Sequence, residues 1–167
     1  LAPLVGVERL EAGKATAVIR FTLSAPRTSA TGIPEGTQVR TADKRYFKTE
    51  KYAEILPGEL TVDVVAVADE AGSNSDGIAE GEINVLVDPI PYVSGAKSVS
   101  ASTGGTDTEG DDSFTRRINY APSIFSVAGP VDAYEYFASS WRPDVADTKI
   151  VCKEGYTIHI YFLMAGG

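Results

Sequence analysis

An α+β fold is predicted for this chain, with a β-rich, sandwich-like N-terminal part followed by a small part of two helices and a β-hairpin. Short alternating stretches separated by glycine and proline turns dominate residues 14–105. Helical spacing of apolar residues begins only after Gly104-Gly105, and two further strand-like stretches end the chain. Several short strands at this spacing favour a sandwich or a partly open barrel.

Alternation of apolar and polar residues predicts the strands of the first half. The stretch from Ala15 to Leu23 alternates as a half-buried strand does, and Leu60 to Ala68 does so after the turn at Pro57-Gly58. Shorter strands are predicted at 37–41, 46–49, 83–87 and 97–102. Residues 26–34 are rich in Ser, Thr, Gly and Pro, which predicts a loop.

Capping and proline signals predict two helices in the second half. Asp111 and Asp112 are N-cap candidates for a helix over 113–120, and Pro122 ends it. A second helix is predicted over 131–141, after Pro130 and before Pro143. Four of its residues recur at helical spacing and are expected to face the hairpin: Tyr134, Phe137, Ala138 and Trp141.

The chain is expected to end in a hairpin and to divide into two domains. Strands at 147–153 and 156–164 are joined by a predicted turn at Glu154-Gly155. We expect a β-rich domain over 14–105 and an α+β domain over 106–167. Residues 1–13 are interpreted as a lead-in from a missing N-terminal region. Because the first residue is Leu1, not Met, and the chain stops directly after a strand, a fragment of a longer protein is expected.

Composition argues against nucleic-acid binding and membrane insertion. The formal net charge is −8 and the pI about 4.6, whereas nucleic-acid binding usually requires a basic stripe. Apolar runs stay shorter than the 18 or so residues of a membrane span. The single cysteine, Cys152, cannot form an internal disulfide, which favours folding in a reducing compartment.

Residue patterns for catalysis, cofactors and metals are weak, so no enzyme, cofactor or metal site is expected. His159 is the one histidine, and it is interpreted as structural although Cys152 lies on the neighbouring predicted strand. A calcium loop starting at Asp107 fails at its sixth and twelfth positions, which hold Asp112 and Ile118. One Cys and one His cannot build a structural zinc site.

Six short motifs, taken in order, resemble those of the baseplate J-like family of contractile phage tails and related injection systems. The first is the turn Ile33-Pro34-Glu35-Gly36-Thr37-Gln38-Val39, and the second is Leu56-Pro57-Gly58-Glu59 before the strand that ends at Ala68. The third is Glu70-Ala71-Gly72, and the fourth is the step Gly81-Glu82-Ile83-Asn84. The fifth is an acidic linker from Gly104 into the helix that carries Arg116 and Arg117, and the sixth is Ala128-Gly129-Pro130 before Ala133-Tyr134-Glu135-Tyr136.

This resemblance implies a structural protein of the virion tail baseplate, assembled in the bacterial host cytoplasm. Its implied partners are other baseplate proteins of the wedge and copies of itself in a ring, with no small-molecule substrate. Charges of both signs in the linker and first helix could fix the register between neighbours. The candidate interface residues are Asp107, Glu109, Asp111, Asp112, Arg116 and Arg117. The alternative is a carbohydrate-binding or adhesion module with exposed aromatics on one sheet face.

Overall fold

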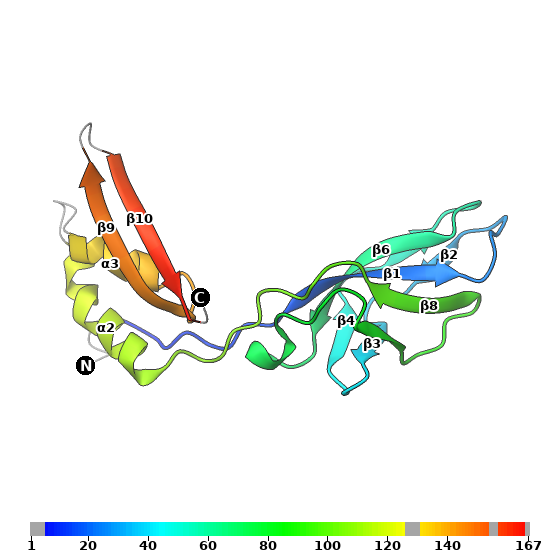
Figure 1. The fold of residues 1–167 in the computed structure, drawn as a ribbon, viewed down its shortest axis with the longest axis horizontal. Helices are drawn as coiled ribbons and strands as arrows, with labels where there is room; N and C mark the ends of the chain where they lie inside the picture. Colours follow the sequence, from blue (N-terminus) through cyan, green and yellow to red (C-terminus); the bar gives the residue numbers. More distant parts are fainter. Residues whose placement is uncertain (1–5, 126–130, 154–156, 166–167) are drawn as a thin grey trace. The chain divides into compact units, whose positions relative to one another are not determined.

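The computed structural model describes residues 6–125, 131–153 and 157–165, and it confirms the α+β class. The chain divides into two compact units (Figure 1). The β unit is Gly13–Gly105, and the mixed unit combines Leu1–Ala12 with Thr106–Gly167. The chain therefore begins in the mixed unit, makes the whole β unit and then returns to the mixed unit.

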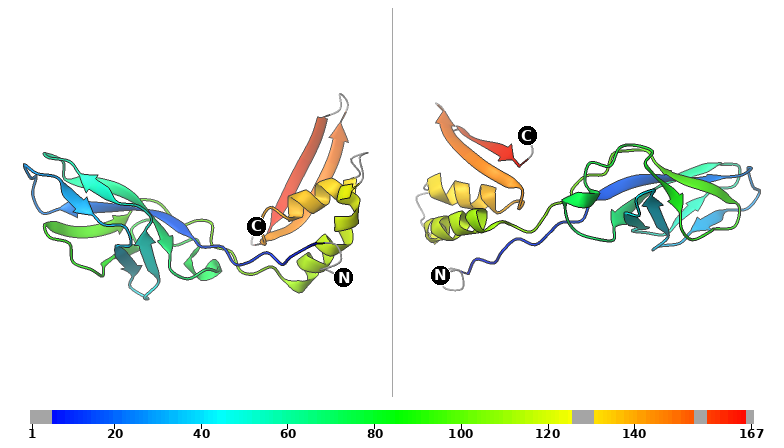
Figure 2. Two further views of the ribbon diagram at one scale, coloured as in Figure 1. Left: turned by 180° about the vertical axis from the view of Figure 1, so that it is seen from behind. Right: turned by 60° about the horizontal axis from the view of Figure 1, so that its bottom comes forward.

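The β unit is built on one six-stranded antiparallel sheet with the order β7-β3-β4-β6-β1-β8. Its strands are β1 (Thr16–Leu23), β3 (Gln38–Thr41), β4 (Tyr46–Thr49), β6 (Thr61–Ala68), β7 (Ile83–Leu86) and β8 (Val93–Ser98). The two strands at the ends of this order, β7 and β8, contact each other, so the sheet curls into a nearly closed barrel (Figure 2). Of the two architectures expected, the partly open barrel fits this single curled sheet.

Side chains that alternate along the strands fill the interior of the barrel. Phe21 on β1 and Phe47 on β4 are fully buried, as are Ile19 and Ile83. In the register of β1 with β6, Phe21 lies opposite Val62. The alternation predicted for these strands is therefore the pattern by which they fill the core.

Two short strands depart from the sequence prediction. β2 (Thr31–Ile33) lies inside the stretch predicted as a loop, and it pairs with β5 (Ala53–Ile55), which was not predicted. Three residues are too few to give a periodic signal, and Gly32 lies in the middle of β2. The strand predicted at 97–102 is shifted to Val93–Ser98, where Gly95 weakens the pattern but pairs with Thr22.

Arg20 on β1 and Asp63 on β6 form a cross-strand ion pair, and the contribution of this pair to the stability of the fold depends on pH. The Nε and Nη2 atoms of Arg20 each donate to a carboxylate oxygen of Asp63 at 2.7 Å. These hydrogen bonds, together with the positive charge, lower the pKa of Asp63. Because the lowered pKa lies below that of the unfolded chain, about 3.9, the pair stabilises the fold above about pH 4, and this stabilisation is lost as the pH falls further.

We expect Arg20→Gln to raise the pKa of Asp63 toward its ordinary value, as measured by NMR titration of the carboxyl carbons. Asp69 is the control, because its pKa is lowered by Lys48 rather than by Arg20. An Asp63 pKa that does not move in the variant would show that Arg20 does not set it.

The mixed unit contains two helices and a hairpin. Its elements are α2 (Asp111–Tyr120), the 3-10 helix η2 (Ala121–Phe125), α3 (Val131–Ser139), β9 (Val145–Lys153) and β10 (Thr157–Met164). β9 and β10 pair antiparallel, and α3 packs against β9. The turn predicted at Glu154-Gly155 lies outside the described residues.

One local prediction in this unit was wrong, and a second was right in part. The N-cap of α2 is Gly110 with no side-chain cap, and Asp111 and Asp112 instead lie in the first turn, where their charge suits the helix dipole. Of the residues expected to face the hairpin, Ala138 is buried, and the ring centroid of Trp141 lies 5.5 Å from that of Phe162 on β10. Phe137 is instead 63% exposed, and the helix ends before Trp141.

Candidate functional site

The most enclosed charges in the described chain are Glu109 and Arg117, which form an ion pair inside the mixed unit. Their side chains are 1% and 4% exposed. The Nε atom of Arg117 donates to Glu109 Oε1 at 2.7 Å, and its Nη2 atom donates to Oε2 at 2.8 Å. This bidentate arrangement is the strong geometry for a guanidinium and a carboxylate.

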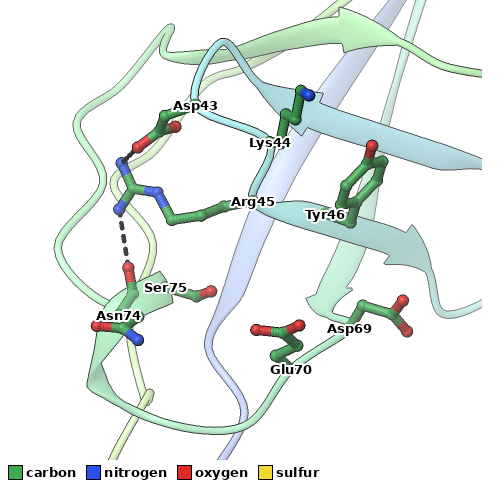
Figure 3. Close-up of a pocket in the computed structure, with 8 residues that line it drawn as sticks. All are labelled: Asp43, Lys44, Arg45, Tyr46, Asp69, Glu70, Asn74 and Ser75. Atoms are coloured by element: carbon green, nitrogen blue, oxygen red, sulfur yellow. Dashed lines mark hydrogen bonds and ion pairs between the residues drawn. The ribbon is translucent and has the colours of Figure 1, made fainter.

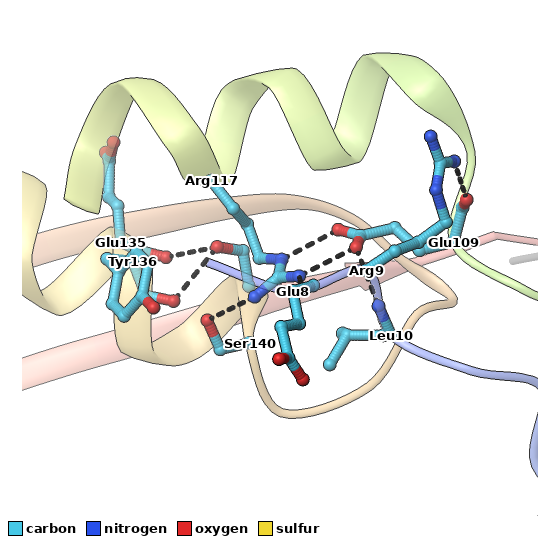
Figure 4. A network of polar contacts seen from close by, with 9 residues as sticks. Glu8, Arg9, Leu10, Glu109, Arg117, Glu135, Tyr136 and Ser140 are labelled. Atoms are coloured by element: carbon cyan, nitrogen blue, oxygen red, sulfur yellow. Dashed lines mark hydrogen bonds and ion pairs between the residues drawn. The ribbon is translucent and has the colours of Figure 1, made fainter. Parts of the chain in front are cut away.

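The N-terminal segment supplies further partners for this pair, as Figure 4 shows. The backbone nitrogen of Leu10 donates to Glu109 Oε2 at 3.1 Å, and Arg117 Nη2 donates to the carbonyl oxygen of Glu8 at 2.5 Å. The hydroxyl of Ser140, just after α3, accepts from Arg117 Nη1 at 3.3 Å. One ion pair therefore joins α2, the end of α3 and a segment about a hundred residues earlier in the sequence.

Arg9 fixes the same segment to the start of α2 from the outside. Its Nη1 atom donates to the carbonyl oxygen of Glu109 at 2.5 Å, and its Nη2 atom lies 2.6 Å from Asp111 Oδ1. Its guanidinium also lies over the ring of Phe114, 4.7 Å from the centroid. Residues 8–10 are thus bonded to the start of α2 and belong to the mixed unit.

The structure separates the six candidate interface residues into two groups. Glu109 and Arg117 are buried and hold the mixed unit together. Their charges therefore do not lie on the surface, where a neighbouring subunit would contact them. Asp107, Asp111 and Asp112 are exposed. Arg116 is half-buried, and its Nη1 atom donates to the carbonyl oxygen of Ala146 at 2.8 Å. An interface role for these residues stays a prediction.

A polar pocket of about 490 Å³ lies on the β unit beside the β3–β4 hairpin (Figure 3). Arg45 crosses it, with Nη1 donating to the carbonyl oxygen of Asn74 at 2.8 Å and Nη2 lying 2.8 Å from Asp43 Oδ2. The hydroxyl of Thr41 and the guanidinium of Arg45 lower the pKa of Asp43. The charges of Arg45 and Asp43 are therefore engaged with each other, which suits a structural role for both side chains.

The register of the hairpin places His159 and Cys152 on opposite faces. His159 lies opposite Val151, whereas Cys152 lies opposite Ile158. Neighbouring positions along a strand point to opposite faces, so these two side chains cannot form a nucleophile–base pair. His159 instead stacks against Tyr161, with ring centroids 6.2 Å apart.

Within the residues described, no group of three or more His, Cys, Asp or Glu side chains could hold a metal ion. None of the helices among residues 6–125, 131–153 and 157–165 is long and apolar enough to cross a membrane.

The β unit defines a small, nearly closed antiparallel β-barrel domain, and comparison with known proteins specifies its family. The family model described as "Baseplate J-like protein barrel domain" matches residues 18–105, which is more than half of the chain. The chain therefore belongs to the Baseplate J-like family, and the resemblance drawn from its motifs is confirmed.

A solved structure supports the same fold. A chain in the cryo-EM structure of the anti-feeding prophage (AFP) baseplate, 6-fold symmetrised, superposes with a TM-score of 0.56 at 12% sequence identity. The match covers 88% of this chain and 46% of that chain, so this chain spans about half the length of its structural relative. A comparison with curated proteins found no match.

Proposed function

We propose that this chain is a structural component of a phage or phage-like tail baseplate and mediates subunit–subunit assembly of the baseplate wedge. The observation that carries the proposal is the Baseplate J-like barrel match over residues 18–105. The likeness to a chain of the AFP baseplate agrees with it in fold. The partners are other baseplate proteins and copies of this chain in a ring, and the role is structural rather than enzymatic.

The proposed domain organisation follows the two units. The β unit is a domain that is inserted between the N-terminal segment and the rest of the mixed unit. The ion pair of Glu109 with Arg117 and the bonds of residues 8–10 stabilise the mixed unit next to the point where the chain leaves for the β unit and returns. Such an insertion presents two separate folded surfaces to neighbouring subunits.

The proposed interface is the exposed acidic surface at the start of α2, comprising Asp107, Asp111 and Asp112. Negative charge at the first turn of a helix is tolerated because of the helix dipole. Asp111 is already paired with Arg9, so Asp112 is the charge of this surface that we propose to fix the register of a positively charged neighbour. Arg116 borders this surface, while Glu109 and Arg117 support it from inside.

The test is to assemble tail particles in the source system with the full-length protein carrying either no change, Asp112→Lys or Asp132→Lys. Gold-labelled antibody against this chain should cluster at one end of the unchanged particles in electron micrographs. Asp112→Lys should reduce the yield of complete baseplates severely. Asp132→Lys is the matched control, because Asp132 lies in the first turn of α3 and is also exposed, so the loss of helix-dipole stabilisation is similar.

Two results would contradict different parts of this proposal. Normal assembly of the Asp112→Lys particles would remove the start of α2 from the interface and leave the baseplate role standing. Tail particles that lack this protein on blots as well as in micrographs would remove the baseplate role itself.

A further inference from the structure

A groove of about 440 Å³ lies on the β unit, beyond the end of the pairing between β3 and β7. The backbone nitrogen of Val87, just after β7, donates to the carbonyl oxygen of Gln38 at the start of β3, at 3.0 Å. The groove is lined from within residues 32–37 on one side and by residues 88–91 on the other. Its volume falls within the roughly 300–1,000 Å³ of ligand-binding pockets, so it can hold a few side chains of a partner.

The wall formed by residues 32–37 is held in place by hydrogen bonds, two of which join it to β4. The carbonyl oxygen of Pro34 accepts from the hydroxyls of Thr37 and Thr49, at 2.7 and 2.8 Å. The backbone nitrogen of Gly36 donates to the carbonyl oxygen of Thr49 at 2.9 Å. Gly36 has a φ of 77°, a conformation that glycine adopts without strain. The barrel itself therefore fixes this wall.

The opposite wall is fixed by a turn and by a stacked arginine. The backbone nitrogen of Val93 donates to the carbonyl oxygen of Ile90 at 3.1 Å, and Pro91 restricts the backbone of this turn. The guanidinium of Arg27 lies 3.6 Å from the centroid of the Tyr92 ring. Since both walls are already in place, binding of a ligand requires little ordering of the protein.

The groove combines an apolar lining with two free carboxylates. Its apolar side chains are Pro34, Pro89, Ile90 and Pro91. Glu35 lies in one wall and Asp88 in the other, and both residues are exposed. Neither carboxylate has a hydrogen bond or an ion pair within the described chain, and no lysine or arginine among the described residues lines the groove. The two acidic side chains are therefore available to a ligand.

The charge of the groove favours a basic segment of another protein as its occupant. Two carboxylates repel phosphate groups, which argues against nucleic acid and lipid headgroups. The formal net charge of −8 favours an oppositely charged partner over a second copy of this chain. Lysine and arginine side chains fit both properties of the groove, because their aliphatic stems pack on apolar surface while their charged ends stay in water.

We propose that this groove binds a short segment of a neighbouring baseplate protein, in which lysine or arginine residues lie next to apolar ones. The apolar side chains of the segment contact the prolines and Ile90, and its cations reach Glu35 and Asp88. This inference rests on the proposed function, because the segment belongs to another subunit of the baseplate.

The first test is NMR titration of the isotope-labelled 167-residue chain with three blocked hexapeptides. They alternate leucine with lysine, with glutamine or with glutamate. We expect the lysine peptide to shift the amide signals of Glu35, Gly36, Thr37 and Ile90 and to bind most tightly. The glutamine peptide should have a dissociation constant ~5-fold or more higher, because exposed ion pairs make a modest contribution each. The glutamate peptide should not bind.

Two double variants locate the charges that bind the lysine peptide. Glu35→Gln combined with Asp88→Asn removes both carboxylates and keeps the shapes of the side chains, and it should raise the dissociation constant ~5-fold or more. Glu59→Gln combined with Glu80→Gln is the matched control, because both residues are exposed in the β unit, lie outside the groove and change the net charge equally. Its effect should stay below ~2-fold, since salt screens distant exposed charges.

The second test identifies the occupant in assembled tail particles. The photoreactive residue benzoylphenylalanine replaces Pro89, an exposed residue of the groove, in the full-length protein, and particles purified from the source are irradiated. Mass spectrometry should map the cross-link to a segment of a different baseplate protein with lysine or arginine next to apolar residues. Val65 is the control position, because it is 43% exposed but lies on β6 outside the groove.

The outcomes that overturn this inference leave the baseplate role standing. In solution they are equal binding of the lysine and glutamine peptides, no amide shifts in the two walls, or equal effects of the two double variants. In particles they are a cross-link from position 89 that is absent, that maps to an acidic segment or another copy of this chain, or that position 65 also forms. Particles that lack this protein would instead remove the baseplate role, and the peptide titration would still test the groove.

Discussion

Replacing Arg117 by alanine is expected to unfold the mixed unit under mild conditions. The change leaves the carboxylate of Glu109, which is 1% exposed, without its guanidinium. Removing one partner of a buried ion pair costs about 3–5 kcal/mol, a large part of the ~5–15 kcal/mol that stabilises a typical domain. Urea unfolding followed by fluorescence measures this directly, because Trp141 is the one tryptophan and lies in the mixed unit.

The neighbouring residue provides a matched control for this variant. The side chain of Arg116 is 40% exposed and lies 3.6 Å from Asp147 through its Nη1 atom. Arg116→Ala removes the same charge from the same helix, and we expect it to cost no more than ~1 kcal/mol. Equal urea midpoints for the two variants would show that the buried pair contributes no more than a surface contact.

A double variant distinguishes the loss of the ion pair between Glu109 and Arg117 from the cost of leaving one buried charge unpaired. Glu109→Gln combined with Arg117→Met removes both charges and keeps side chains of similar length. It should recover part of the stability that Arg117→Ala loses, because no unpaired charge remains. Recovery should be incomplete, since the bonds from Arg117 to the carbonyl oxygen of Glu8 and to Ser140 are lost.

Phe21→Ala is expected to have an effect of similar size on the β unit. Phe21 is fully buried in the barrel, and truncating a buried phenylalanine costs about 3–5 kcal/mol because it loses apolar contacts and leaves a cavity. Hydrogen exchange of the β1 and β6 amides, read by mass spectrometry, should accelerate strongly. If the two units are independent domains, the unfolding curve from Trp141 should hardly change.

Val65→Ala is the control for this second variant. Val65 lies on β6 in the same sheet but is 43% exposed, so its truncation should cost less than ~1 kcal/mol. A shift of the Trp141 curve in Phe21→Ala would contradict the independence of the two domains. Unchanged exchange in β1 and β6 would contradict the central place of Phe21 in the core.

The strands with the longest alternating pattern were the ones that could be predicted from sequence. β1 and β6 were predicted within a residue at each end because eight residues give a clear period of two. β4 was predicted at its observed bounds, Tyr46–Thr49. β2 and β5 were not predicted, because each has only three residues and their pairing joins segments about twenty residues apart.

The candidate site was harder to predict because charge type alone does not reveal burial. In the sequence, Glu109 and Arg117 look like the exposed Asp112 and the half-buried Arg116, and all four were assigned to one interface. Their separation of eight residues, about two helical turns, was a weak indication that they pair. Glu109 precedes the helix, and the side chain of Arg117 extends back toward it. Their other contacts come from Glu8 and Leu10, which no local pattern connects to them.

The fold class, the family and most of the strands and helices could be inferred from the sequence, because these depend on local periodicity, turn residues and ordered motifs. Three features became visible only in the folded chain: the barrel sheet curls so that β7 meets β8, residues 8–10 belong to the mixed unit, and β10 pairs with β9 alone among the described strands. Each of these depends on contacts between segments far apart in the chain, and the free energy of such contacts comes from burial and hydrogen-bond geometry that no short window of sequence contains.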